Sequence, residues 1–473
     1  MPRTNSASRR FAVLSDLFSY KSAITGFIII ILVSILSVYA IIVYPPPVVT
    51  RVWSDPEYWR DKPVLALPTW YSSLTGLNLP PNIVFDTREQ DNRILKYTVS
   101  LNEYTEHEIT LTFNYDYDAF PSEINAYVYA KFKTNPLITI TFIRPDGREI
   151  KLWSGTLNQN ETFLILSNSP ITKKNVQEYY LNTFGEYIYD PNTEIILFAV
   201  EKRGMEKPDT AEVLKSMGKS YRIKIHGTFF EKDSELNVRL IIYGRVWGIL
   251  GTDDRRRDLL IPLIWGAPVA LSFGISLSVI ISLLHMFLGS ISAWFGGKAD
   301  FILQKITEIY MTVPFLSVLV MIAMFYKISI EVVFVSVIIL SLFGGGVKSS
   351  RALALQIKQQ PFIEAAKVYG ASGLRIVVRY IIYAMAPTLV PGIISSIPGF
   401  VFLEAALAYL GLGDPVLPTW GKTINEANSA GALYHFYWWW ILPPVLMLIS
   451  ISLAFSLMGY ALDKIVNPKL REL

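Results

Sequence analysis

Residues 259–297 read LLIPLIWGAPVALSFGISLSVIISLLHMFLGSISAWFGG, a stretch without one charged side chain. About 20 apolar residues in a helix cross a bilayer core of about 30 Å, so this stretch is longer than a single crossing requires. We divide it into an amphipathic segment at the outer membrane interface, residues 259–265, and a spanning helix over about residues 269–295. The stretch therefore predicts a membrane protein.

Five further apolar segments bring the prediction to six spanning helices. The first, residues 24–44, is too long for the apolar part of a secretory signal, and we interpret it as a retained membrane helix. The other four are residues 309–326, 332–347, 385–403 and 438–460.

The charges of the loops predict the orientation of the chain. Residues 348–379 contain six basic residues and one acidic residue, whereas residues 411–437 contain one basic and two acidic residues. Cytoplasmic loops carry an excess of lysine and arginine. We therefore expect a multi-pass protein of the plasma membrane with both termini in the cytoplasm.

The overall composition excludes several classes of protein. Hydrophobic residues make up 52% of the chain and charged residues 17%, against roughly 25% charged in an average globular domain. The net charge of +4 is too small to indicate a nucleic-acid-binding protein. Because the chain has no cysteine, disulfides, thiolate metal clusters and a cysteine nucleophile are excluded.

Residues 48–245 have a different character from the rest of the chain. Alternating apolar and polar residues at 137–142 and 236–240 are typical of half-buried strands, and Pro145-Asp146-Gly147 is typical of a turn. Since the first helix leaves the cytoplasm, we expect this β-rich domain, a sandwich in our interpretation, to be extracellular. The predicted order is a cytoplasmic N-terminus with the first helix (1–47), the inserted domain (48–245), the transmembrane domain (246–463) and a cytoplasmic tail (464–473).

The segment 362–375, FIEAAKVYGASGLR, lies in the basic cytoplasmic loop at about residues 348–380. Good helix formers precede Gly370, so we expect a short helix that ends in a turn with a positive φ at this glycine. The small side chains of Ala365 and Ala366 would let the surface of another protein approach this helix closely. The pattern predicts a helical plug that projects from a membrane protein.

This segment resembles the EAA loop of ABC importer permeases, because Glu364-Ala365-Ala366 is followed after three residues by Gly370. In that family the loop forms a coupling helix that docks in a groove of a cytoplasmic ATPase subunit. The resemblance assigns ATPase coupling to Glu364, Ala365, Ala366, Gly370, Ala371, Ser372 and Arg375.

Other segments are similar to the permeases of dipeptide and oligopeptide importers. Residues 250–267 resemble their G-T-D-x-x-G-R-D segment, residues 407–421 their F-L-G-L-G and S-W-G elements, and residues 438–471 their last helix and tail. The large β-rich insertion lies outside the resemblance. The departures from the family pattern are Arg256 in place of a glycine, Pro262 and Pro268 in place of arginines, and Tyr383 in place of a proline.

The resemblance implies a subunit of an ATP-driven type I importer that forms half of the translocation path for oligopeptides or similar small solutes. Its expected partners are a second homologous permease, two ATP-binding cassette ATPases, an extracellular substrate-binding protein and membrane lipid, without nucleic acid. The chain lacks the phosphate-binding pattern G-x-x-x-x-G-K-[ST]. We therefore expect no enzyme activity and no bound cofactor, with ATP and Mg²⁺ held by the partner subunits.

Two ionisable residues lie within the predicted helices. Glu404 is in or near the fifth helix, where a buried carboxyl group is expensive; a role in the path or between subunits competes with an interfacial position. His285 is alone in an apolar helix, and we expect a packing or hydrogen-bonding role for it. No residues are predicted to be catalytic or to bind a metal.

Alternative functions stay open at this point. The same importer class could carry an oligosaccharide or a metal, and a membrane-anchored receptor or structural protein would explain the external domain. A secondary transporter is disfavoured, because the helices show no paired carboxylates and no evident inverted repeat.

Overall fold

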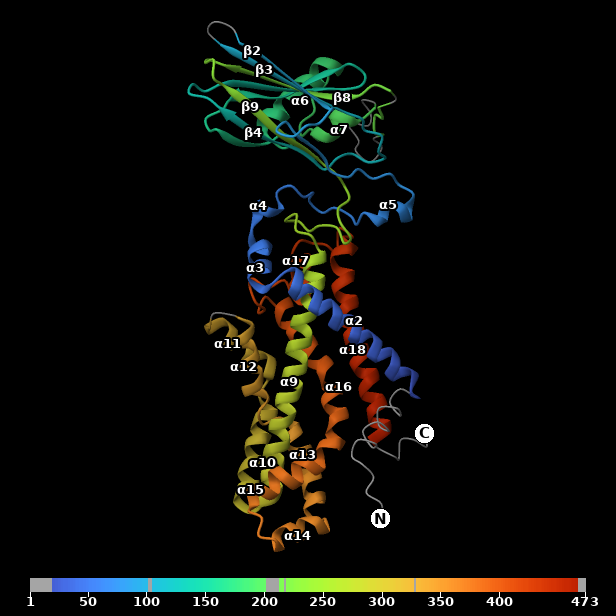
Figure 1. The fold of residues 1–473 in the computed structure, drawn as a ribbon, viewed down its shortest axis with the longest axis vertical. Coiled ribbons are helices and arrows are strands. Elements are labelled where there is room, and N and C mark those ends of the chain that lie inside the picture. The colour runs from blue at the N-terminus through green and yellow to red at the C-terminus, as the bar shows by residue number, and fades with distance from the viewer. Residues whose placement is uncertain (1–18, 101–103, 201–211, 217, 327–328, 467–473) are drawn as a thin grey trace. The chain divides into compact units, whose positions relative to one another are not determined.

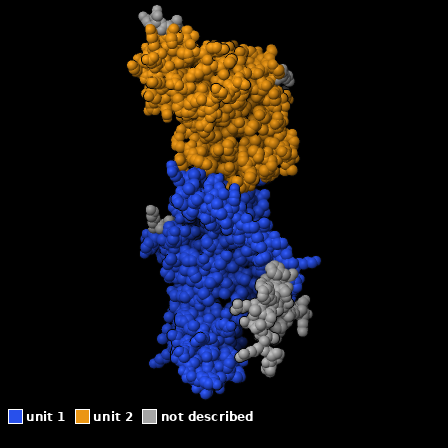
Figure 2. Space-filling view, viewed as in Figure 1, with its two compact units in different colours: residues 1–54, 261–473 blue, residues 55–260 orange. Residues whose placement is uncertain are grey.

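The computed structural model describes residues 19–100, 104–200, 212–216, 218–326 and 329–466. The chain forms two compact units, coloured separately in Figure 2. Unit 1 contains residues 1–54 and 261–473, and unit 2 contains residues 55–260. The predicted cytoplasmic start up to residue 18 and the tail match at residues 467–471 lie outside the described residues.

Unit 1 is helical (Figure 1). A π-helical turn, Val377–Ile381, joins α15 to α16, so that one helix continues from residue 373 to residue 409. The helices are α2 (Lys21–Val43), α3 (Pro46–Ser54), α9 (Leu260–Phe295), α10 (Gly297–Thr312), α11 (Phe315–Phe325), α12 (Ile330–Ser341), α13 (Gly345–Lys358), α14 (Pro361–Val368), α15 (Gly373–Ile376), α16 (Ile382–Tyr409), α17 (Trp420–Ser429) and α18 (Trp438–Val466).

Four of these helices in the described part of the chain are long and apolar enough to cross a membrane: α2, α9, the continuous helix 373–409 and α18. They contain the predicted spans 269–295, 385–403 and 438–460, and the predicted span 24–44 except its last residue. Two bent helix pairs, α10 with α11 and α12 with α13, could each form one more span. The predicted number of six is reached only if each bent pair crosses once.

The predicted division of residues 259–297 is wrong. α9 runs without a break from Leu260 to Phe295, with Pro268 inside it. Its first turns are held within unit 1, because Trp265 Nε1 donates to the Tyr44 carbonyl at 2.9 Å. A helix with packed first turns can extend beyond the length of one crossing, so the two predicted segments form one continuous helix.

Two other predicted spans are not single helices. Residues 309–326 are broken at Val313 and Pro314, and α10 and α11 bend there by 77°. Pro314 has no N–H for a helical bond and restricts Val313 to an extended conformation. Residues 332–347 are broken at the extended Gly344, where α12 and α13 bend by 49°. Hydrophobicity does not reveal either break, because the chain is apolar on both sides.

Small residues allow α2, α16 and α18 to pack closely. A Cβ atom on Gly26 of α2 would lie 2.6 Å from the carbonyl oxygen of Ala454 in α18. A Cβ atom on Gly459 of α18 would lie 2.1 Å from Ser395 Oγ in α16. Helices in lipid gain little from burying apolar surface against each other, so close backbone approach contributes more of their association.

Unit 2 contains two antiparallel sheets (Figure 1). The strand order is β1-β9-β4-β7 in one sheet and β2-β3-β8-β5-β6 in the other. The prediction of a β-rich region is confirmed. The strands are β1 (Ile83–Asp86), β2 (Ile94–Ser100), β3 (Thr105–Phe113), β4 (Glu123–Lys131), β5 (Leu137–Ile143), β6 (Glu149–Thr156), β7 (Glu161–Ile165), β8 (Tyr221–Phe229) and β9 (Glu235–Tyr243).

One apolar core is shared by the two sheets of unit 2. Along β3 and β8 buried residues alternate with half-buried ones, as the two-residue period of a strand requires. The rings of Phe85 in β1 and Phe113 in β3 lie 5.9 Å apart across the two sheets. The helices of this unit are α4 (Pro56–Trp59), α5 (Trp70–Thr75), α6 (Pro170–Phe184) and α7 (Thr193–Phe198).

Candidate functional site

The predicted coupling segment forms a short helix, α14, with Pro361 in its first turn. Gly370 follows the helix with a φ of +76°, as expected, and its N–H donates to the Lys367 carbonyl at 2.9 Å. The N–H of Ala371 donates to the Ala366 carbonyl at 3.0 Å. A Cβ atom on Gly370 would meet nothing within 4 Å, so the backbone conformation, and not space, favours glycine here.

One face of α14 is anchored on the rest of unit 1. Ile363 and Ala366 are buried in an apolar cluster that includes Ala293 of α9. The ammonium group of Lys367 lies 5.3 Å from the ring centroid of Trp294, within the range of a cation–π contact. The position of α14 is therefore tied to the end of α9.

The helices before and after α14 contact the same end of α9. Lys358 Nζ donates to the carbonyls of Ala293 and Trp294 at 2.9 Å each. The last carbonyls of a helix have no partner within it, so a lysine in this position satisfies them and complements the helix dipole. On the other side, a Cβ atom on Gly373 would lie 2.7 Å from Trp294 Nε1. Three consecutive helices thus converge on Trp294.

The opposite face of α14 is open. Glu364 and Ala365 are exposed, and so is the apolar side chain of Phe362. Val368 and Tyr369, just before the turn, are 86% and 89% exposed. A helix with one anchored face and one apolar exposed end is suited to bind another protein.

The other predicted coupling residues divide between the two faces. Ala366 is 3% exposed, so the expectation that it faces another protein is wrong; its methyl group packs inside the chain. Ala371 is half-buried, whereas Ser372 and Arg375 are exposed.

Sequence reasoning missed Val368 and Tyr369. Val368 does not lie on the three-residue spacing of Ile363 and Ala366, and this mismatch was the available signal for it; Tyr369 continues that spacing and gave no such signal.

A bidentate ion pair joins the two bent helix pairs beside this loop. Arg351 of α13 donates from Nε and Nη2 to the two carboxylate oxygens of Asp300 in α10, both at 2.5 Å. The Asp300 carboxylate also accepts a hydrogen bond from Ser292 of α9. This geometry is the strongest form of an arginine–carboxylate pair. It connects α9, α10 and α13, which precede α14 in the chain.

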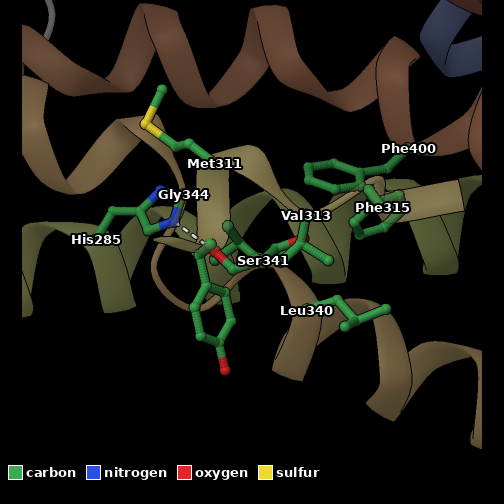
Figure 3. A pocket seen from close by; sticks show the side chains of 10 residues that line it. His285, Met311, Val313, Phe315, Leu340, Ser341, Gly344 and Phe400 are labelled. Atoms are coloured by element: carbon green, nitrogen blue, oxygen red, sulfur yellow. Dashed lines mark hydrogen bonds between the residues drawn. The ribbon is translucent and has the colours of Figure 1, made fainter. Parts of the chain in front are cut away.

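A cavity of about 420 Å³ lies where both bent helix pairs are broken (Figure 3). His285 of α9 donates from Nε2 to the Ser341 carbonyl at 2.8 Å, which confirms the expected hydrogen-bonding role. Figure 3 shows Phe315 and Phe400 on the far side of the cavity from this imidazole. The cavity is lined by Ile281, His285, Tyr310, Met311, Val313, Phe315, Leu340, Ser341, Gly344 and Phe400.

Glu404 of α16 is 7% exposed and has a hydrogen bond with the side chain of Thr419. Thr419 caps α17, and a Cβ atom on Gly421 would lie 2.3 Å from the Ala405 carbonyl oxygen. The carboxyl group therefore lies where α16 and α17 meet closely. This position favours an internal role over a contact with a second subunit.

The described residues contain no cluster of three histidine, aspartate or glutamate side chains that could hold a metal ion. The polar groups near the cavity are instead used in contacts within unit 1. The coupling segment and the cavity are thus the two features that carry an argument about function.

The membrane part of the chain is similar to known transport proteins. Residues 285–472 match the family of binding-protein-dependent transport system inner membrane components. The oligopeptide transport system permease protein OppC of Bacillus subtilis is 27% identical over 225 residues, which cover 47% of this chain and 72% of that protein. The dipeptide permease DppC of Lactococcus lactis is 28% identical over 225 residues, covering 47% and 64%.

A third relative is named for a different solute. The glutathione transport system permease protein GsiD of Pectobacterium atrosepticum is 28% identical over 233 residues, which cover 47% of this chain and 73% of that protein. The matched family segment contains α14 and all the lining residues of the cavity except Ile281, and it contains no residue of unit 2. The membrane part of this chain is therefore similar to the permeases of dipeptide and oligopeptide importers, and the β-rich unit lies outside the matched segment.

Proposed function

We propose that this chain is the permease subunit of an ATP-driven, binding-protein-dependent importer and that α14 transmits the work of ATPase subunits to the membrane helices. The two faces of α14 carry this proposal. Its buried face is fixed to Trp294, so a force on the exposed Val368 and Tyr369 is passed to α9 rather than absorbed by a loose loop. Binding and release of a partner there would shift the permease between two states.

The exposed end of α14 can be tested with a matched pair of tyrosines. Tyr369→Ala removes a side chain that is 89% exposed in the coupling segment, and Tyr383→Ala removes one that is 79% exposed in α16. We expect the first variant, and Val368→Asp, to lose copurification with the ATPase subunits and solute uptake while still inserting in the membrane. Tyr383→Ala should retain both. Normal uptake by Tyr369→Ala and Val368→Asp would contradict the coupling role.

The proposed orientation has α14 in the cytoplasm and unit 2 outside the cell. The basic loop at residues 348–379 supports it. Because the chain has no cysteine, Tyr189→Cys in unit 2 and Tyr369→Cys near α14 give two single-cysteine proteins at sites 88% and 89% exposed. A membrane-impermeant maleimide should label the first in intact cells and the second only after permeabilisation. The reverse pattern would invert the topology.

We also propose that the cavity beside His285 belongs to the translocation path. Backbone that leaves the helical conformation at membrane depth is tolerated where it is buried in protein or borders water. Both helix breaks, at Val313-Pro314 and at Gly344, border this one cavity. Phe400→Trp should therefore slow uptake of bulky solutes more than small ones, and equal slowing of all solutes would argue against a lining role.

The proposed solutes are oligopeptides or similar small molecules. The names of the relatives support this class, because they refer to oligopeptide, dipeptide and glutathione transport. Uptake of radiolabelled di- to pentapeptides by cells with and without this chain tests the class. Uptake of Ni²⁺ or an oligosaccharide in place of peptides would select the alternative solutes, and isolation without any ATPase would favour a membrane-anchored receptor.

A further inference from the structure

The two sheets of unit 2 have four edge strands, and three of them are short or covered. β1 has four residues, and Arg93 donates to its Val84 carbonyl at 3.2 Å. β7 has five residues. β6 is covered by α6, from which Asn175 donates to the Leu152 carbonyl at 3.3 Å. Natural sheets protect their edges by such means because an open edge pairs readily with another strand.

The fourth edge strand, β2, has none of these protections among the described residues. It has seven residues, no proline and one charge, Lys96. Leu95, Tyr97 and Val99 form an apolar stripe on one face of the strand and are 50%, 60% and 54% exposed. A long apolar edge of this kind is suited to strand pairing between chains.

The register of β2 shows which backbone groups are open. The N–H of Thr112 in β3 donates to the Arg93 carbonyl at 2.9 Å. In an antiparallel pair every second residue directs its backbone N–H and C=O groups toward the neighbouring strand. Since Arg93 bonds to β3, the odd-numbered residues of β2 bond to β3 as well. The N–H and C=O groups of Lys96, Thr98 and Ser100 therefore point away from β3, toward the open edge.

We propose that β2 pairs antiparallel with β2 of a second copy of this chain, about a two-fold axis at Tyr97. In this register Lys96 lies opposite Thr98 of the other copy, and the outward backbone groups of these two residues exchange hydrogen bonds. Leu95 lies opposite Val99 and Tyr97 opposite Tyr97, so all three apolar residues gain apolar neighbours.

The charge pattern excludes a register centred on Lys96, and the apolar stripe favours the register centred on Tyr97 with a second copy as the partner. Centring the pair on Lys96 would place two ammonium groups directly opposite each other, which is destabilising. Centring it on Tyr97 places no like charges opposite one another and joins identical patches, as two-fold symmetry requires. Seven residues form a small contact, so the pairing depends on the high local concentration of chains held in one membrane.

The absence of cysteine makes a direct crosslinking test possible. Tyr97 would form a non-hydrogen-bonded pair with a Cα separation of about 4.5 Å, within disulfide reach. Tyr97→Cys in the full chain, oxidised in native membranes with copper phenanthroline, should give several-fold more disulfide-linked dimer than Leu137→Cys. Leu137 is a matched control, because it is 44% exposed but lies in β5, which is paired on both sides.

Two further arms test the register and the backbone pairing. Leu95→Cys coexpressed with Val99→Cys should crosslink as a mixed dimer, whereas Leu95→Cys alone should not, because its two sulfurs would be about four residues, or about 13 Å, apart. Lys96→Pro removes an outward N–H and keeps the bonds to β3, so it should abolish the dimer of Tyr97→Cys.

Several results would overturn the proposal. One is a yield of disulfide-linked dimer from Tyr97→Cys no greater than that of the Leu137→Cys control. Another is a disulfide of Tyr97→Cys with a different protein, which excludes a second copy as the partner. Persistence of the dimer in the Lys96→Pro background would exclude strand pairing.

Discussion

Unit 1 and unit 2 differ in where their apolar side chains lie. In unit 2 the strands bury one face, and the other face of β3 and β8 carries charged pairs such as Glu108 with Lys224, 2.9 Å apart. In unit 1 the exposed surface itself is apolar, with Leu32 and Ile35 of α2 each 60% exposed. Water drives the first arrangement, whereas lipid permits the second. Large apolar side chains in unit 2 therefore lie mostly in the core, with the exposed stripe on β2 as an exception, whereas in unit 1 an apolar side chain does not by itself indicate the core.

The largest expected effect breaks the core of unit 2. Phe142→Ala removes a fully buried ring that lies 5.2 Å from the ring of Phe198 and 5.7 Å from that of Tyr221. We expect a loss of about 3–5 kcal/mol in the free energy of unfolding of unit 2, from lost burial and the cavity left behind. Hydrogen exchange of β5 peptides in the full chain measures it. Phe230→Ala, at a site 54% exposed, is the control and should change little.

A smaller effect is expected where unit 1 depends on close backbone approach. Gly421→Ala would place a Cβ atom 2.3 Å from the Ala405 carbonyl oxygen, which forces α16 and α17 apart. We expect a loss of about 1–3 kcal/mol, typical of overpacking, seen as a lower thermal midpoint in detergent. Gly399→Ala in α16 is the matched control, because a Cβ atom there meets nothing within 4 Å. If the two variants are equally stable, small-residue packing does not hold this contact.

The ion pair between Asp300 and Arg351 should contribute less. Both side chains are partly exposed, so Arg351→Met should lower the free energy of unfolding of unit 1 by about 1 kcal/mol or less. The exchanged variant, with Asp300→Arg and Arg351→Asp together, should recover part of this loss in the same thermal measurement. If the exchange is worse than either single change, the hydrogen bond with Ser292, and not the charge pair, is the important contact.

The smallest effect is a pH dependence of unit 2. Burial lowers the pKa of His107 below its usual value, and its ring bonds to Thr98 Oγ1 at 3.0 Å and Ser234 Oγ at 3.1 Å. Because the unfolded chain takes up a proton more readily than the folded one, stability should be unaffected above about pH 7 and should fall as the pH drops below about 6.5. Hydrogen exchange of β3 at pH 7.5 and 5.5 measures the change, and His107→Gln should reduce the difference.

Much of unit 2 was predictable from local patterns. The alternation at residues 137–142 and 236–240 lies in β5 and β9, and the predicted turn at Gly147 has a φ of +84°. The pairing of distant strands was not predictable, because β3 lies between β2 and β8, which is more than 100 residues away in the chain. No residue pattern within either strand specifies that partner.

In unit 1 the sequence revealed the coupling segment, but it did not reveal which face of α14 is buried and which is exposed. The alanines of the motif look equivalent in the sequence, yet Ala365 is exposed and Ala366 is buried against α9. Which methyl group faces inward depends on where Trp294 lies, and Trp294 is 72 residues earlier in the chain. The cavity beside His285 was equally hidden, because its lining comes from helices that are far apart in the chain.

The sequence by itself determined the membrane character of unit 1, the β-rich character of unit 2, and the short helix that ends at Gly370, because each depends on hydrophobic period or on the φ preference of a few neighbouring residues. Only the tertiary structure decided that two predicted spans are bent, that Ala366 is buried, and that β2 has an open edge. These features depend on contacts between distant segments, which local side-chain preferences do not encode.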